Sequence, residues 1–221
     1  TLEKDYALTW LLSGTYSRDS KLRELLILKG GTAIRKVYFP EWRLSEDLDF
    51  TVMPEGPVGS GQVLPILEQL LARVHDASGI DFSVRAPYLR ERPNGLSAEG
   101  RIYYRGPRNA PMAASLKLDL SAEEKVVRPT VLRPIAHPYP DQLSDPGTAR
   151  CYAFEELFAE KIRVMGERSR PRDLYDIIDL FWRQDLKAEP ALIRTVLTEK
   201  CRVKGIPIPT LKTIQNPSRR A

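Results

Sequence analysis

The stretch LILKGGTAIRKVYFPEWRLSEDLDFTV, residues 26–52, is the part of the sequence that most clearly indicates a fold. It places two neighbouring glycines, Gly30 and Gly31, at an expected helix start, and an acidic pair, Asp47 and Asp49, at an expected strand start. Glycines let a backbone approach a phosphate closely, and N–H groups at a helix start favour anionic ligands. Residues two apart on a strand point the same way, so Asp47 and Asp49 project together. These parts predict a triphosphate site at one end and a divalent metal site at the other.

The glycine turn is the expected phosphate end of this site. Gly30 and Gly31 should lie under the β- and γ-phosphates, with the hydroxyl and N–H of Thr32 donating to them. Lys29 and Arg35 are nearby cations, Arg35 about one turn into the helix. The alternative is an ordinary loop between helices, where glycine is common. The acidic strand that follows favours the phosphate site over that loop.

A second motif lies in the helical part of the chain. On an expected helix over residues 153–168, Lys161 falls on the apolar stripe, where a lysine is costly unless an anion meets it. A bound triphosphate would be such an anion, and a lysine that snorkels from the edge of the stripe is the alternative. The next helix should begin at a proline, with Asp173 and Asp176 in its first two turns. Favourable interaction with the helix dipole is the alternative role for Asp173.

These motifs carry a resemblance to a family. A Gly-Gly-Thr helix start followed by Asp-x-Asp resembles the polymerase-beta-like nucleotidyltransferase superfamily. The fuller wording KGGTAIRK…RLSEDLDF looks like the AbiEii/MenT-type nucleotidyltransferase toxins of bacterial toxin–antitoxin systems. The stretch RPRDLYD, residues 170–176, is similar to that family's Arg-x-Lys-Asp-x-x-Asp motif, with Arg172 replacing the lysine. The resemblance covers about residues 26–52 and 152–182.

The resemblance implies metal-dependent chemistry on an NTP. Mg²⁺ or Mn²⁺ would bridge the triphosphate while an acceptor hydroxyl attacks opposite the leaving pyrophosphate. Asp47 and Asp49 would be metal ligands, and Asp119, on an expected strand over residues 114–120, would complete the metal site or act as the base. Alternatively, Asp47 and Asp49 are turn-forming acids in a polar loop. The alternative for Asp119 is a surface charge pair with Lys117.

The resemblance also assigns roles in the second motif, where Lys161 would contact the nucleotide and Asp173 or Asp176 would orient it or the base. The predicted residues fall into two overlapping sets. The catalytic candidates are Asp47, Asp49, Asp119, Lys161 and Asp176, and the nucleotide-binding candidates are Lys29, Gly30, Gly31, Thr32, Arg35, Lys161 and Asp173.

Apolar spacing predicts an α/β (α+β) chain with two domains. A polymerase-beta-like domain with a mixed sheet is expected over residues 1–130, followed by a mainly helical bundle domain with a basic tail over residues 131–221. The expected helices cover residues 3–28 (as two helices), 32–38, 62–78, 153–168, 171–185 and 189–202. The expected strands cover residues 48–52, 80–85, 101–105, 114–120 and 131–132.

The chain carries a formal net charge of +5, which favours an anionic partner such as RNA without proving one. Cations and aromatic residues interleave between residues 85 and 108, where arginines would bind phosphates and tyrosines would stack on unpaired bases. The alternative is a solvated hairpin rim. The RNA-binding candidates are Arg85, Arg90, Arg101 and Arg105, and the stacking candidates are Tyr88, Tyr103 and Tyr104.

No apolar run approaches the ~20 residues of a membrane span, and no signal-peptide pattern opens the chain. Cys151 and Cys201 are far apart and lack neighbours with metal-ligand spacing, which indicates free thiols in a reducing compartment. We therefore expect a cytoplasmic protein with no membrane partner.

The resulting hypothesis is a toxin that moves a nucleotide from an NTP to RNA. The resemblance implies the tRNA 3′ end as acceptor, a block of translation, and a cognate antitoxin as partner. Two alternatives stay open: nucleotidyl transfer to a small molecule or a protein hydroxyl, and a non-catalytic nucleic-acid-binding protein on the same fold.

Overall fold

The computed structural model describes residues 1–168, 170–183, 186 and 188–212. The chain divides into two compact units. Unit 1 comprises Thr1–Glu123 and Thr130–Cys151, and unit 2 comprises Glu124–Pro129 and Tyr152–Ala221. The division differs from the expected boundary at residue 130, because residues 131–151 add two strands to the sheet of unit 1 and residues 124–129 belong with the helices.

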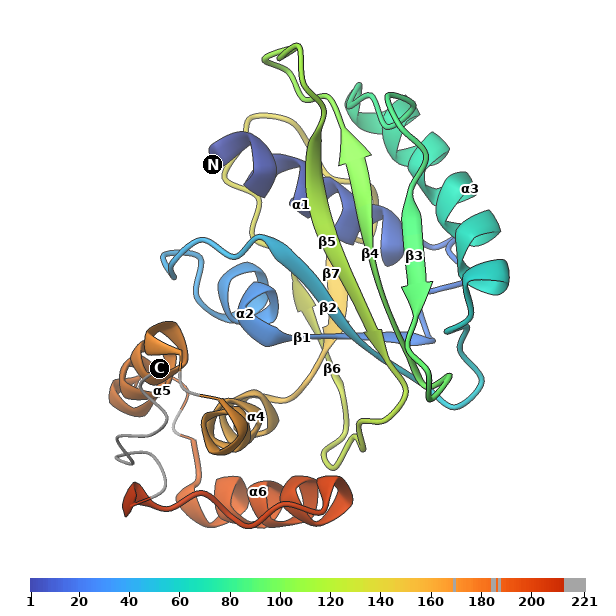
Figure 1. The fold of residues 1–221 in the computed structure, drawn as a ribbon. Coiled ribbons are helices and arrows are strands. Elements are labelled where there is room, and N and C mark those ends of the chain that lie inside the picture. The colour runs from blue at the N-terminus through green and yellow to red at the C-terminus, as the bar shows by residue number, and fades with distance from the viewer. Residues whose placement is uncertain (169, 184–185, 187, 213–221) are drawn as a thin grey trace. The chain divides into compact units, whose positions relative to one another are not determined.

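Unit 1 is built on a seven-stranded mixed sheet with the order β3-β4-β5-β2-β1-β7-β6 (Figure 1). The central strand β2 is antiparallel to β1 and parallel to β5, while β1 is parallel to β7. The strands are β1 (Leu26–Lys29), β2 (Asp47–Val52), β3 (Tyr88–Glu91), β4 (Ser97–Tyr104), β5 (Ala114–Ser121), β6 (Val131–Pro134) and β7 (Thr148–Cys151).

Two long helices of unit 1, α1 (Leu2–Thr15) and α3 (Ser60–Ser78), pack against each other and cover one face of the sheet (Figure 1). Gly14 of α1 lies directly against Val74 of α3, which allows the close approach. β5 buries Leu116, Leu118 and Leu120 on the helix-covered face and places Lys117 and Asp119 on the other. The period of two therefore separates an apolar core face from a polar open face.

A short helical stretch joins β1 to the loop before β2. It begins as α2 (Gly30–Ala33) and continues as a π-helical turn, η1 (Ile34–Tyr38). The helix expected over residues 32–38 is thus present, with π geometry in its second half. This stretch places the two glycines directly at the carboxyl end of β1.

The sequence prediction for residues 3–28 is wrong in its second half. α1 ends at Thr15, and residues 26–29 form β1. The leucines before Lys29 fit helical spacing, but a strand buried on both faces also shows a continuous apolar run. The strand expected over residues 80–85 is reduced to an isolated bridge between Asp81 and Arg105. β3 and β7, four residues each, were not predicted.

Unit 2 contains α4 (Phe154–Glu167), α5 (Pro171–Trp182) and α6 (Pro190–Lys204). α4 and α5 fall within their expected ranges, and α6 extends two residues beyond the expected end at residue 202. Residues 184 and 185 of the second range lie outside the described residues. α4 and α6 pack through a small core that includes Ala159, Val196 and Cys201. The expected tail lies partly outside the described residues, which end at residue 212.

The segment 124–129 is tied to unit 2 by a buried carboxylate. Glu156 on α4 accepts hydrogen bonds from the backbone N–H groups of Val127 (3.0 Å) and Arg128 (2.8 Å). Its other partner is Lys200 on α6, whose Nζ lies 3.0 Å from Glu156 Oε1 and 3.2 Å from Glu160 Oε2. This cluster explains why a segment between two strands of unit 1 belongs to the helical unit.

Two further expectations concern membranes and thiols. Cys151 and Cys201 are free, as predicted, and both are buried. Within the described part of the chain, no helix combines the length and the apolar character that a membrane crossing requires.

Candidate active site

The glycine turn and the acidic strand lie side by side in unit 1. Gly30 has a φ of +71°, a left-handed conformation that favours glycine. A Cβ at this position would overlap the carboxylate of Asp49. β1 and β2 pair so that Lys29 lies opposite Asp49. Two motifs separated in the chain are thus brought together, with an acidic side chain directly against the turn at the helix start.

The third predicted carboxylate belongs to the same face. Asp119 on β5 lies opposite Asp49, and Lys117 lies opposite Asp47, in the parallel pairing of β2 with β5. Nζ of Lys117 donates to Oδ2 of Asp119 at 2.6 Å. Burial alone would lower the pKa of Lys117, but the hydrogen bond to Asp119 and the charges of Asp119, Asp47 and Asp49 raise it overall. The ammonium group therefore lies in the electrostatic field of all three aspartates.

This arrangement bears on the predicted metal site. Among the described residues, no three His, Cys, Asp or Glu side chains are gathered in a form ready to hold a metal ion. The alternative weighed for Asp119, a charge pair with Lys117, is present in the structure. Mg²⁺ binds through few protein carboxylates while keeping several waters. Asp47, Asp49 and Asp119 are the carboxylates of this face that could hold such an ion, which stays a prediction.

Thr32 has a different contact from the one predicted. Its hydroxyl is buried and donates to the carbonyl of Asp47 at 2.5 Å, and it lies 2.9 Å from the Ser45 hydroxyl. A hydroxyl has one proton to donate, so the expected donation from this hydroxyl to a phosphate is not the arrangement seen. Thr32 instead ties the helix start to the start of β2, which holds Asp47 beside the turn.

Arg35 also points to a partner that the sequence did not indicate. Its Nε donates to Oδ1 of Asp5 on α1 at 3.1 Å, and its Nη1 donates to the carbonyl of Trp42. The neighbouring Lys36 donates to Oδ2 of Asp5 at 2.6 Å. Burial would raise the pKa of Asp5, but the hydrogen bonds and charge of its partners, Lys36 first, lower it overall. Arg35 therefore fastens the helical stretch to α1, and its predicted contact with a nucleotide has no support in this geometry.

The second motif forms a buried cluster inside unit 2. Nζ of Lys161 lies 2.8 Å from Oδ2 of Asp176 and 3.7 Å from Oδ1 of Asp173. Arg168 binds the other side of Asp173, with Nε 2.9 Å from Oδ2. Lys161 is buried and Asp173 points inward, as predicted. However, the anion that meets Lys161 is Asp176, so a triphosphate is not required to explain its burial. Its contact with the nucleotide stays a prediction.

The arginine-rich hairpin separates into exposed and packed members. Arg85, Arg90 and Arg101 are exposed, and the guanidinium of Arg85 also lies 4.2 Å from the centre of the Tyr103 ring. Arg105 is involved in the bridge to Asp81, and its Nε is buried without a hydrogen-bond partner. Tyr104 is 1% exposed and belongs to the core, so the prediction that it stacks on a base is wrong.

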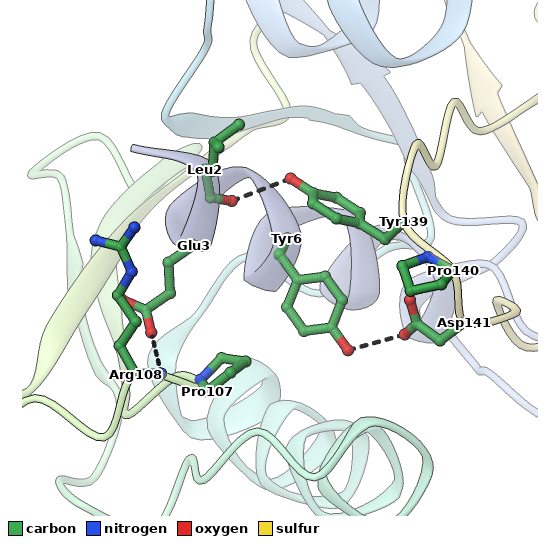
Figure 2. Close-up of a pocket in the computed structure, with 8 residues that line it drawn as sticks. All are labelled: Leu2, Glu3, Tyr6, Pro107, Arg108, Tyr139, Pro140 and Asp141. Atoms are coloured by element: carbon green, nitrogen blue, oxygen red, sulfur yellow. Dashed lines mark hydrogen bonds between the residues drawn. The ribbon is translucent and has the colours of Figure 1, made fainter.

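Sequence reasoning also missed an aromatic cavity of about 400 Å³ in unit 1 (Figure 2). Tyr6 and Tyr139 meet edge to face, with ring centres 5.0 Å apart. Both hydroxyls donate hydrogen bonds to other residues that line the cavity. The Tyr6 hydroxyl donates to Asp141 at 2.8 Å, and the Tyr139 hydroxyl donates to the carbonyl of Leu2 at 3.0 Å. The signal in the sequence was weak, because the tyrosines are 133 positions apart. The lining residues are Leu2, Glu3, Tyr6, Pro107, Arg108, Tyr139, Pro140 and Asp141.

With this geometry established, the chain can be compared with known proteins. The family model described as "Nucleotidyl transferase AbiEii toxin, Type IV TA system" matches residues 11–221. The chain belongs to this AbiEii family. The family resemblance seen in the sequence is therefore confirmed, and the protein is a nucleotidyltransferase of a toxin–antitoxin system. Such a system implies an antitoxin partner.

One solved structure supports the fold, and a second gives a weaker match. MenT4, a nucleotidyltransferase toxin from Mycobacterium tuberculosis H37Rv, superposes with a TM-score of 0.61 at 19% identity, covering 98% of this chain and 72% of that chain. An antigenic nucleotidyltransferase-like protein from Paracoccidioides brasiliensis gives a TM-score of 0.43 at 12% identity, covering 98% of each chain. No curated protein matches the sequence. The AbiEii chain thus has the predicted nucleotidyltransferase fold.

Proposed function

We propose that the protein transfers a nucleoside monophosphate from an NTP to a hydroxyl of RNA in a metal-dependent reaction. The observation that carries this proposal is the contact between the Gly30 turn and Asp49, with Asp119 opposite Asp49 on the next strand. A turn without a side chain can approach a phosphate, and the adjacent carboxylates can hold a divalent ion. A turn that only connects two elements would not need carboxylates beside it, so this geometry favours a triphosphate site over an ordinary loop.

The chemistry divides among the residues of the open sheet face. Asp47 and Asp49 would hold a divalent ion, which would supply positive charge to stabilise the reacting phosphate group. Asp119 would accept the proton of the attacking hydroxyl at a carboxylate oxygen, once Lys117 has released it. A new bond then forms between the acceptor oxygen and the α-phosphorus, and pyrophosphate leaves. Lys29, opposite Asp49, would offset negative charge of the triphosphate.

Two features support RNA as the acceptor. The chain carries a net charge of +5, and Arg101 is exposed on the same face as the aspartates. The tRNA 3′ end as acceptor, the resulting block of translation, and action in the cytoplasm rest on the family. Lys161, with Asp173 and Asp176 beside it, is proposed to contact the nucleotide.

A labelling experiment tests the proposal. The full chain is incubated with Mg²⁺, total tRNA and each of the four NTPs carrying a label on the α-phosphate. We expect label to appear on RNA with at least one NTP, and to disappear with Asp49→Asn. Label on protein or on small molecules alone would favour the alternative acceptors. No transfer to RNA with any NTP, in Mg²⁺ or Mn²⁺, would refute the proposal.

A further inference from the structure

The open face of the sheet carries a continuous polar row that leads away from the aspartates. Asp47 on β2 lies opposite Lys117 on β5, which lies opposite Arg101 on β4, which in turn lies opposite Tyr88 on β3. Residues directly opposite each other in neighbouring strands share a face of the sheet. The row therefore crosses four adjacent strands (Figure 1), from the candidate metal ligand to the outer strand.

A second row runs beside the first. It connects Asp49, Asp119, Glu99 and Arg90 across the same four strands. Because Asp47 and Asp49 are two residues apart on one strand, both rows lie on the same face. Beyond the first row, on the side away from the second, Tyr103 lies opposite Ser115 and carries the guanidinium of Arg85 against its ring. The face thus combines carboxylates on β2, β5 and β4 with arginines and tyrosines on β4 and β3.

The side chains of Tyr88 and Arg101 are exposed to solvent rather than packed in the core. Tyr88 is 55% exposed, although large aromatic side chains contribute most when buried. Arg101 is exposed, and its Nη1 donates to the Ser115 hydroxyl at 3.0 Å. A guanidinium has five N–H donors, and this bond uses one while fixing the direction of the group. The remaining edge can bind a phosphate, which Arg recognises through paired donors.

This surface chemistry suits an unpaired polynucleotide. Aromatic side chains on an open sheet face stack on the bases of single-stranded RNA, and neighbouring arginines bind its backbone. The four strands span three inter-strand spacings, about 14 Å, and four-stranded RNA-binding sheets stack two or three bases. A short unpaired segment can therefore lie across β3, β4 and β5 with its end at the aspartates.

We propose that this face binds the unpaired 3′ segment of the acceptor RNA, with Tyr88 stacking on a base and Arg101 binding an adjacent phosphate. The terminal hydroxyl then lies next to Asp119. The direction of the RNA and its role as acceptor rest on the proposed function, whereas binding does not require transfer. The inference narrows the predicted RNA-binding set to Tyr88, Arg90 and Arg101. Arg85 holds Tyr103, and Arg105 belongs to the bridge with Asp81.

Binding is measured without NTP, by fluorescence anisotropy of a labelled unpaired oligoribonucleotide with the full chain. Loss of one base stack weakens single-strand binding by about fivefold to 100-fold, which is the effect expected for Tyr88→Ala. Tyr88→Phe keeps the ring and should bind like the wild type. Arg101→Ala should weaken binding and reduce the slope of affinity against salt by about one phosphate contact.

The matched control for charge is Arg73→Ala. Arg73 is exposed on α3, which covers the opposite face of the sheet, so this variant loses the same charge but should keep its RNA affinity. Equal affinity of Tyr88→Ala and wild type, an equal loss in Arg73→Ala and Arg101→Ala, or equal binding of a duplex of the same length would each overturn the proposal.

The two proposals fail in different ways. RNA binding that follows the Tyr88 and Arg101 pattern, without any label transfer to RNA, would support this binding face and refute the transferase proposal. Label transfer to RNA with wild-type KM for RNA in Tyr88→Ala and Arg101→Ala would support the transferase and refute the binding face. Asp49→Asn should bind RNA in either case, because Asp49 acts on the nucleotide.

Discussion

Lys117 in unit 1 and Lys200 in unit 2 both lie among carboxylates, but the two clusters are built in opposite ways. The side chains of Lys117 and Asp119 are 40% and 28% exposed, and they pair only with each other in the contacts described above. The side chains of Lys200 and Glu156 are 1% and 0% exposed. Lys200 also donates to the carbonyl of Lys125, and Glu156 accepts two backbone N–H groups.

The difference separates a cluster that can exchange partners from one that cannot. A buried ion pair completed by backbone hydrogen bonds is strongly destabilised when one member is removed, because the other charge is left buried. A partly exposed pair on an open face has water as an alternative partner, so it can be opened at small cost. The unit 1 cluster can therefore accept a cation or a substrate, while the unit 2 cluster holds chain segments together.

Lys161 is intermediate between these two types. Its side chain is 11% exposed and its partner Asp176 is 0% exposed, which resembles the closed cluster. We propose, however, that it contacts the nucleotide. Substitutions in the exposed and the buried clusters should therefore differ in their effects on activity and on stability.

Replacing Asp49 should have the largest effect on activity. Asp49→Asn keeps the shape but removes the charge, and loss of a metal ligand should lower the rate of label transfer by about 10³- to 10⁴-fold. The fold should be unaffected, because Asn has the size and shape of Asp and fits the same space beside Gly30. The control is Glu46→Gln, since Glu46 lies just before the strand and pairs with Lys4 at 2.8 Å instead. A variant with more than a tenth of wild-type activity would contradict the assignment of Asp49.

Replacing Lys200 should have the largest effect on stability. Lys200→Met leaves Glu156 buried without its ammonium, which should lower the free energy of unfolding by about 3–5 kcal/mol in urea denaturation. The control is Arg202→Met on the same helix. The Arg202 side chain is 68% exposed and pairs with Glu199. This control should leave the midpoint almost unchanged. A similar midpoint for the two variants would show that the closed cluster does not hold unit 2 together.

Substitutions at Lys161 test whether its cluster is a structural ion pair, like that of Lys200, or takes part in activity. Lys161→Met alone should destabilise the protein by about 3 kcal/mol, because Asp176 loses its partner. Lys161→Met combined with Asp176→Leu removes both charges and should recover most of that stability. We expect the double variant to fold and to remain inactive, with KM for the NTP raised in any residual activity. A stable double variant with wild-type activity would place Lys161 with the structural ion pairs.

Lys117 should show the smallest effect, on metal affinity. Lys117→Met removes the ammonium that competes for Asp119, so the half-saturating Mg²⁺ concentration should fall by about threefold to tenfold. Direct Mn²⁺ titration without RNA gives the same quantity independently of the acceptor. Lys125→Met, which removes an exposed lysine of unit 2, serves as control. An unchanged or higher metal requirement in Lys117→Met would show that Lys117 does not occupy the cation position.

The sequence predicted the elements with long amphipathic patterns and failed at short or buried strands. α3 and α4 follow their apolar stripes closely. β1 was taken for a helix because its leucines also fit a helical period, and β7 alternates but has only four residues, too few for a reliable strand signal. Fold class was nevertheless predictable, since the glycine turn and the acidic strand are local motifs that the family shares.

The site was predictable only where it depends on local motifs. The placement of Asp49 against Gly30 followed from chain order and strand geometry. The partner of Arg35 comes from α1, thirty positions earlier. The role of Lys117 depends on parallel pairing between β2 and β5, which no spacing within one strand reveals. Residues whose function comes from register or packing between distant segments were therefore missed or misassigned.

The attachment of residues 124–129 to unit 2 has a consequence for dissecting the protein. The chain passes between the units at three places, after Glu123, after Pro129 and after Cys151. A fragment starting at Tyr152 would include every helix of unit 2 but would lose two N–H donors to Glu156 and one acceptor of Lys200. If that fragment were insoluble, we would attribute this to the loss of the hydrogen bonds from residues 124–129. It would not show that unit 2 needs unit 1 in order to fold. Grafting the six residues 124–129 onto the fragment through a short linker should restore its folding.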